Sequence, residues 1–136
     1  MLVDVRRVFS EGVSRMSAQM RAVVLDEQGP PDVLKTRLCP VPTPGIGEVL
    51  IQVRACALNH LDIWCRSSLP GVKLPLILGC DVSGIVSELG AGVRHVKVGD
   101  RVVADPGLSC GTCRECLGGL ENICRHYHWR TSSVSF

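Results

Sequence analysis

Residues 110–124 read CGTCRECLGGLENIC and carry four cysteines, separated in turn by two, two and seven residues. Glycines at positions 111, 118 and 119 let the backbone fold around a common centre, and the stretch holds few apolar residues from which to build a core. A structural zinc ion takes four ligands in a tetrahedron, with Zn–S distances of about 2.3 Å. Because four cysteines leave no coordination position open for water or substrate, the spacing predicts one structural zinc per chain. Its ligands would be Cys110, Cys113, Cys116 and Cys124.

Disulfides and an iron–sulfur cluster are the two alternatives for these cysteines. Disulfides need an oxidising compartment, whereas the opening of the chain lacks the apolar stretch and the small-residue cleavage site of a secretory signal. We therefore expect a cytoplasmic protein with reduced thiols, and zinc as the bound metal. Zinc binding in such a loop contributes on the order of 10 kcal/mol. The lobe, which we place at residues 106–127, should therefore collapse when a chelator removes the metal.

The overall composition is that of one compact domain. The chain has 136 residues, of which 46% are hydrophobic and 21% charged. Its formal net charge of +2 is too small, and its Lys and Arg residues too scattered, to form the basic face that binds nucleic-acid phosphates. No apolar run approaches the roughly 20 residues that span a bilayer. We expect neither nucleic acid nor membrane among the partners.

Short β-branched runs separated by glycine and proline dominate the chain upstream of the cysteines, and this pattern is typical of strands joined by turns. The predicted strands cover residues 22–25, 33–38, 49–57, 81–89 and 101–104. One stretch, residues 59–65, departs from the pattern, because an asparagine that can cap a helix precedes apolar residues at helical spacing. The sequence predicts a mainly β, barrel-like fold with short helices.

The first nineteen residues show no sustained strand pattern, and a second methionine, Met20, stands just before the first predicted strand. We expect residues 1–19 to form a disordered extension. An arginine-rich opening is also compatible with a mitochondrial presequence, but such segments are poor in acidic residues and this one contains Asp4 and Glu11.

Three further motifs precede the cysteine loop in the sequence. The chain reads MRAV at 20–23, PGIGEVL at 44–50 and VGDRV at 98–102, and the four cysteines follow. From residue 20 to residue 127 this order resembles the zinc-containing medium-chain dehydrogenase/reductase family, which includes alcohol dehydrogenases and quinone oxidoreductases. The resemblance implies a GroES-like, partly open barrel over residues 20–127 with a zinc-binding lobe.

In that family a Rossmann domain that binds NAD or NADP follows the barrel. No G-x-G-x-x-G follows a strand in this sequence, and Gly90-Ala91-Gly92 supplies only the first pair of glycines. Residues 128–136 also depart from the family pattern, and we interpret them as a divergent tail. We therefore expect no Rossmann domain and no cofactor-binding residue here, and a NADP or NAD cofactor only in a full-length relative.

The resemblance also implies where catalytic groups would lie. Alcohol dehydrogenases of the family hold a second zinc through a Cys in G-x-C-x-[Ser/Thr]-Asp and a His in Gly-His-Glu. Here the first stretch reads ALNHLD at 57–62, so Asn59 replaces the cysteine and Leu61 the hydroxyl residue, and the second reads GCD at 79–81. Zinc-free quinone and enone reductases of the family often carry Asn and Asp three residues apart. This similarity implies that Asn59 and Asp62 are the catalytic residues.

A second metal site remains an alternative, because Cys80, His60 and Asp81 offer a thiolate, an imidazole and a carboxylate. The simpler interpretation makes Cys80 a small buried residue and His60 a solvent-facing side chain at a helix start. Cys39, Cys56 and Cys65 are expected to be packing residues.

Two hypotheses for function follow. The first is an incomplete zinc-binding oxidoreductase, inactive alone because nothing holds a cofactor against the substrate. The second is a zinc-stabilised, non-catalytic binding module. It would form a homo-oligomer or another complex through the exposed face that would otherwise pack on a Rossmann domain.

Overall fold

The computed structural model describes residues 18–129, and strands dominate this range with a few short helices between them. In chain order the elements are β1 (Gln19–Leu25), η2 (Pro31–Val33), β2 (Leu34–Pro40), β3 (Val49–Ala57), α1 (His60–Ser67), β4 (Leu76–Ile77), β5 (Asp81–Leu89), β6 (Arg101–Val103), β7 (Gly107–Leu108), α2 (Arg114–Leu117), η3 (Glu121–Ile123) and β8 (His128–Trp129). The mainly β class is confirmed.

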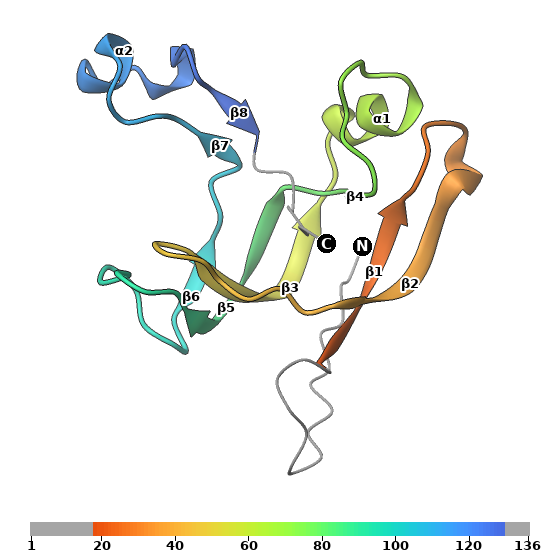
Figure 1. The fold of residues 1–136 in the computed structure, drawn as a ribbon, viewed down its shortest axis with the longest axis horizontal. Helices are drawn as coiled ribbons and strands as arrows, with labels where there is room; N and C mark the ends of the chain where they lie inside the picture. Colours follow the sequence, from red (N-terminus) through yellow and green to blue (C-terminus); the bar gives the residue numbers. More distant parts are fainter. Residues whose placement is uncertain (1–17, 130–136) are drawn as a thin grey trace.

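The strands of the described range form three small antiparallel sheets that do not close into a complete barrel. Figure 1 shows the β1–β2 pair on one side, the β3–β5 pair in the middle, and a lobe built from β7, α2 and β8 on the other side. The lobe that carries the four cysteines therefore stands apart from the first sheet.

The first sheet has the order β2-β1-β4 and holds most of the buried apolar side chains. β1 runs antiparallel to β2 from the Gln19–Pro40 pair to the Leu25–Leu34 pair. The alternation along β1 turns Ala22 and Val24 toward one small core, which Cys39 and Ile77 complete. Leu25 belongs to a second core, described next.

The second core joins the first sheet to α1. Leu25, Leu76 and Leu78 pack there against Cys65 of α1. Cys39 and Cys65 are 1% and 6% exposed, which agrees with their expected role as packing residues. Burial of these side chains holds α1 in place, and α1 in turn positions the residues at its N-terminus.

The second sheet has the order β3-β5-β6 and carries the chain toward the lobe. β3 pairs with β5 along nearly its whole length, with register shifts at Leu50/Ile51 and Val53/Ala55. Gly84 of β5 faces the backbone of Gln52, so a β-carbon at this position would collide with the Gln52 carbonyl. The close approach of the two strands explains a glycine in the middle of a strand.

β7 and β8 close the base of the lobe through the pairs Gly107–Trp129 and Leu108–His128. The predicted tail at 128–136 thus begins within β8, and its remaining residues lie outside the described range. The predicted extension also lies outside that range except for its last two residues, and Gln19 opens β1. No helix between residues 18 and 129 has the length and apolar character needed to cross a membrane.

Candidate metal centre and substrate-side residues

The four cysteines of the lobe come together in space. Their sulfur atoms all lie within 4.8 Å of one another. The distances from Cys116 Sγ are 3.9 Å to Cys110 Sγ and 3.4 Å to Cys113 Sγ, and Cys113 Sγ lies 3.9 Å from Cys124 Sγ. A zinc tetrahedron with Zn–S bonds of about 2.3 Å has edges of about 3.8 Å. The sulfur positions therefore fit a single tetrahedral ion, and all four cysteines are free thiols rather than disulfides.

Local backbone structure explains why these residues converge. Cys113 caps α2, whose single turn carries Cys116, and the short helix η3 ends at Cys124. Gly111 and Gly119 have φ angles of +70° and +75°, a conformation that strongly favours glycine, and both allow the chain to reverse direction within the loop. Cys116 and Cys124 are buried, whereas Cys110 and Cys113 are half-buried.

Backbone N–H groups point at the sulfurs. The N–H of Cys113 donates to Cys110 Sγ, and the N–H groups of Cys110 and His126 both donate to Cys124 Sγ, each at 3.3 Å. Such donors stabilise the negative charge of a thiolate. The lobe is therefore arranged to receive thiolates, the form of cysteine that binds metals.

The surroundings of Cys110 and Cys116 shift the pKa values of the two thiols in opposite directions. Hydrogen bonds from the backbone N–H groups of Thr112 and Cys113, followed by the Thr112 hydroxyl, lower the pKa of Cys110 to about 5. Burial, followed by the neighbouring Cys113 and Cys124 side chains, raises the pKa of Cys116 to about 12. In the metal-free protein, Cys110 therefore gives up its proton at a lower pH than Cys116 does.

An ion pair crosses the metal loop next to these ligands. Glu115 Oε1 accepts hydrogen bonds from Arg125 Nη2 at 3.1 Å and Nε at 3.3 Å, and the side chains are 19% and 69% exposed. The pKa of Glu115 is lowered, first by its own backbone N–H and then by the Cys113 and Arg125 side chains. Sequence reasoning misses this pair, because charged residues beside cysteines are common and only loop closure shows which of them meet.

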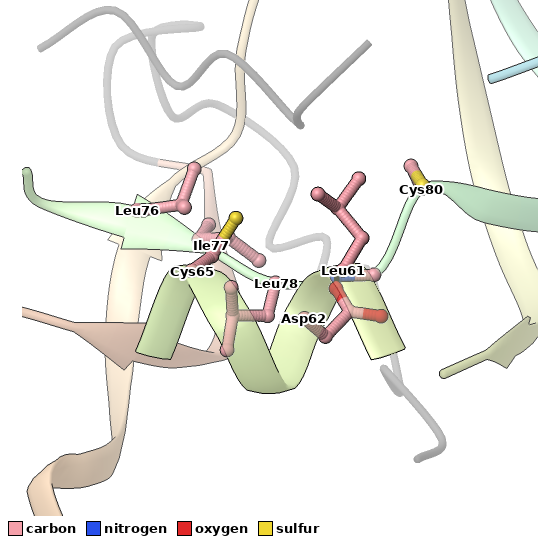
Figure 2. Close-up of a pocket in the computed structure, with 8 residues that line it drawn as sticks. Leu61, Asp62, Cys65, Leu76, Ile77, Leu78 and Cys80 are labelled. Atoms are coloured by element: carbon pink, nitrogen blue, oxygen red, sulfur yellow. Dashed lines mark hydrogen bonds between the residues drawn. The ribbon is translucent and has the colours of Figure 1, made fainter. Parts of the chain in front are cut away.

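Asp62, one of the two predicted catalytic residues, is buried at the start of α1. Its Oδ2 accepts the N–H of Asn59 at 2.8 Å, as the third helical residue of a capping box does, and its Oδ1 accepts the N–H of Gly79 at 2.7 Å. In Figure 2 the Asp62 carboxylate lies beside Leu61, near the segment that leads from Leu78 to Cys80. Asp62 thus ties the start of α1 to the entry of β5.

The Asp62 side chain also lines a cavity of about 10 Å³ between α1 and residues 76–80. The cavity is almost entirely apolar apart from this carboxylate, and it has room for about one water molecule. It is too small to admit a substrate.

Asn59, the other predicted catalytic residue, donates a hydrogen bond from its side-chain amide to Asp81 Oδ2. Asp81 faces a wide hollow of about 240 Å³, formed by β3, β5 and β6. The residues that line the hollow are Ala55, Cys56, Ala57, Asp81, Val82, Ser83 and Val103. The structure therefore joins Asn59 to Asp81, which lines a space large enough for a small molecule, whereas Asp62 lines the small cavity.

The three residues considered for a second metal are arranged differently. Within residues 18–129 the cysteine cluster is the one group of three or more metal-ligating side chains close enough to hold an ion. Cys80, His60 and Asp81 do not form such a group, and the His60 ring instead lies 6.1 Å from the Trp64 ring. Burial, followed by the charges of Asp81 and Asp62, raises the pKa of Cys80. A second metal site stays a prediction without a preformed geometry.

The sequence and the structure match known proteins. The family model of the alcohol dehydrogenase GroES-like domain matches residues 45–134. An L-threonine 3-dehydrogenase from Bacillus velezensis is 36% identical over 115 residues, which cover 82% of this chain and 33% of that enzyme. This chain thus spans about a third of the length of that relative.

Solved structures give the same result. A crystal structure of an NAD-dependent alcohol dehydrogenase matches with a TM-score of 0.77 and 48% identity, over 81% of this chain and 33% of that one. A cobalt- and zinc-bound thermostable alcohol dehydrogenase from Pyrobaculum aerophilum matches with a TM-score of 0.75 and 38% identity, over 79% and 33% of the two chains. Further matches include quinone oxidoreductases.

The strand order, the cysteine loop and these matches agree, and they confirm the predicted GroES-like fold. The chain belongs to the family of alcohol dehydrogenase GroES-like domains, whose relatives are zinc-type alcohol dehydrogenases, threonine dehydrogenases and quinone oxidoreductases.

Proposed function

We propose that Cys110, Cys113, Cys116 and Cys124 hold one structural zinc ion. The observation that supports this site most strongly is the spacing of the sulfurs, which all lie within 4.8 Å of one another. When bound, the ion supplies a cross-link between the two ends of the lobe and no chemistry on a substrate, because four thiolates fill its coordination sphere. The chain's own contribution is the set of backbone N–H groups that donate to the sulfurs of Cys110 and Cys124 and stabilise the thiolates without metal.

For the protein as a whole we propose the substrate-side domain of an NAD(P)-dependent oxidoreductase that reduces a quinone or a conjugated ketone. The supporting observation is the hydrogen bond between Asn59 and Asp81, which joins two positions that the resemblance assigns to catalytic-zinc ligands and their neighbours. Asparagine is a poor zinc ligand beside thiolate and imidazole. These two side chains are therefore better suited to orient a carbonyl group than to hold a metal.

In this proposal the dinucleotide would supply the hydride when it is bound by another part of the protein, and solvent would supply the proton that completes the reduction. Asn59 keeps a second amide N–H after its bond to Asp81, since the amide group has two. That N–H donates to the carbonyl oxygen of a substrate lying in the hollow beside Asp81. Asp62 takes no proton in this scheme, because both of its oxygens accept backbone N–H groups.

A chimera tests the proposal. The 136-residue chain would be fused to the portion of the Bacillus velezensis L-threonine 3-dehydrogenase that it does not cover, with the unfused chain as the control. We expect the fusion to oxidise NADPH or NADH with a quinone or an enone, and the chain alone to give no turnover. An Asn59→Ala fusion should lose roughly 100- to 1,000-fold in kcat, as expected for removal of a donor to the carbonyl oxygen. Efficient oxidation of a simple alcohol by the fusion would contradict the proposal.

Contacts with a further protein surface are part of the same proposal. Ile46, Val103 and Leu117 are 88%, 81% and 77% exposed. Large apolar side chains at that exposure favour association. We infer that they pack on the nucleotide-binding part of a complete enzyme or on a second copy of the chain. Light scattering that shows a monodisperse monomer, for the chain and for the fusion alike, would argue against the second partner.

A further inference from the structure

The ion pair between Glu115 and Arg125 lies inside the cysteine loop and connects its two halves. Glu115 stands between Cys113 and Cys116 in α2, while Arg125 directly follows Cys124. Both contacts from the guanidinium, at 3.1 and 3.3 Å, go to the single oxygen Oε1. The other oxygen, Oε2, is buried and has no hydrogen-bond partner.

The loop that holds the four cysteines carries excess negative charge when zinc is bound. Four thiolates carry more negative charge than one Zn²⁺ neutralises, and the carboxylate of Glu115, which lies between Cys113 and Cys116 in the chain, adds a further negative charge to the same loop. Water cannot solvate the buried Oε2 atom. A carboxylate in this position repels the neighbouring thiolates, because like charges at short distance repel. It therefore weakens zinc binding by these thiolates unless a cation neutralises it. Arg125 is the cation in direct contact with it.

We propose that Arg125 is a positioning residue for the zinc site, and that it acts by neutralising Glu115 as well as by holding Cys124 close to α2. This inference rests on the proposed structural zinc. It predicts an asymmetry between the two partners. Loss of Arg125 leaves the carboxylate uncompensated beside the thiolates, whereas loss of the Glu115 charge removes the repulsion together with the pair.

A plain surface ion pair would behave differently. Exposed pairs contribute little, and neutralising either partner then costs about the same. Arg37 and Asp26 form such a pair at 3.0 Å, with side chains 41% and 48% exposed, far from the cysteines. An R37Q variant removes the same charge as R125Q and is therefore a matched control.

The experiment is a zinc competition titration of the full 136-residue chain against a chromophoric chelator. It compares the wild type with R125Q, R125K, E115Q, the double variant R125Q/E115Q and the control R37Q. We expect R125Q to weaken zinc binding by roughly 10-fold, the lower end of the range for outer-shell partners. R125K should recover most of the zinc affinity that R125Q loses. E115Q and the double variant should have similar zinc affinities and should lose clearly less affinity than R125Q. R37Q should bind zinc as tightly as the wild type.

Three results would overturn the inference while the zinc site stands: equal losses for R125Q and E115Q, no loss for R125Q, or a loss in R37Q as large as in R125Q. Failure of the wild type to bind zinc would overturn the proposed metal site itself, and the inference with it. Because R125K keeps the charge, a loss in R125Q that R125K recovers is not due to misfolding.

Discussion

The Sγ atoms of Cys110 and Cys116 lie 3.9 Å apart, and their surroundings shift the pKa values of the two thiols in opposite directions. Backbone N–H groups lower the pKa of the first to about 5, and burial raises that of the second to about 12. As the pH rises from 4 to 7, the metal-free chain should therefore convert Cys110 to the reactive thiolate while Cys116 stays protonated.

Alkylation of the metal-free chain, under mild conditions in which the lobe keeps its fold, checks this difference. At about pH 6 iodoacetamide should label Cys110 first and Cys116 last, because the thiolate is the nucleophile. Peptide mass spectrometry after short labelling times gives the order. Cys80, whose pKa is raised by burial, serves as an internal slow-reacting reference. Labelling of Cys116 before Cys110 would contradict the hydrogen-bonding pattern of the lobe.

The buried carboxylate of Asp62 carries a second prediction at this scale. Asp62→Ala leaves the N–H groups of Asn59 and Gly79 without their acceptor, and loss of the partner of the buried Gly79 N–H alone costs about 1–3 kcal/mol. Asp26→Ala removes an exposed ion pair and should cost less than about 1 kcal/mol. Urea unfolding of both zinc-loaded variants, followed by circular dichroism, compares them. Equal losses of unfolding free energy in the two variants would show that the Asp62 hydrogen bonds do not stabilise the fold more than an exposed ion pair does.

The sequence predicts the residues whose chemistry depends on their spacing along the chain. It does not predict contacts that form only when distant segments, or the two ends of a loop, fold against each other. The four cysteines are found because their spacing alone predicts a common centre. The Asn59–Asp81 bond joins residues 22 positions apart, and a strand register that the sequence leaves open decides whether they meet. The Glu115–Arg125 pair depends in the same way on the path of the loop.

At the scale of elements, the long strands and α1 were predictable. Residues 49–57 and 81–89 match β3 and β5, and the helix predicted over 59–65 is α1 at His60–Ser67. β4, β7 and β8 have two residues each, too few for any periodicity to appear in the sequence. Their positions depend on pairing with distant strands, which local sequence does not encode.

The lobe should behave as a separate unit of stability, since two-residue strands and single helical turns give it little core of its own. In hydrogen exchange of the zinc-loaded chain, removal of the metal should speed exchange of amides in residues 107–129. Amides of β1, β3 and β5 should keep their protection, because β-sheet pairing and apolar burial hold them. Loss of protection throughout the chain would mean that the metal holds the whole domain and not the lobe alone.

At the scale of the whole molecule, the order of the motifs indicated the GroES-like family, whereas composition and periodicity indicated only a mainly β domain. The predicted partly open barrel appears as two three-stranded sheets with the lobe beyond them. The two cores contain no residue of the second sheet, and apolar residues of that sheet such as Val103 are exposed. The chain spans about a third of the length of the relatives it matches, and the proposed contact with a nucleotide-binding part would cover these residues.

Metal content of the purified 136-residue chain tests the central claim most directly. Elemental mass spectrometry should find about one zinc per chain, the stoichiometry of a four-thiolate structural site. Cys110→Ser and Cys124→Ser should each lose the metal, while Cys80→Ser, a matched change outside the cluster, should keep it. A chain without zinc, or a Cys124→Ser variant that still binds it fully, would contradict the account. A second zinc that is lost in Cys80→Ser would contradict the reading of Asn59 and Asp81 as carbonyl-orienting residues.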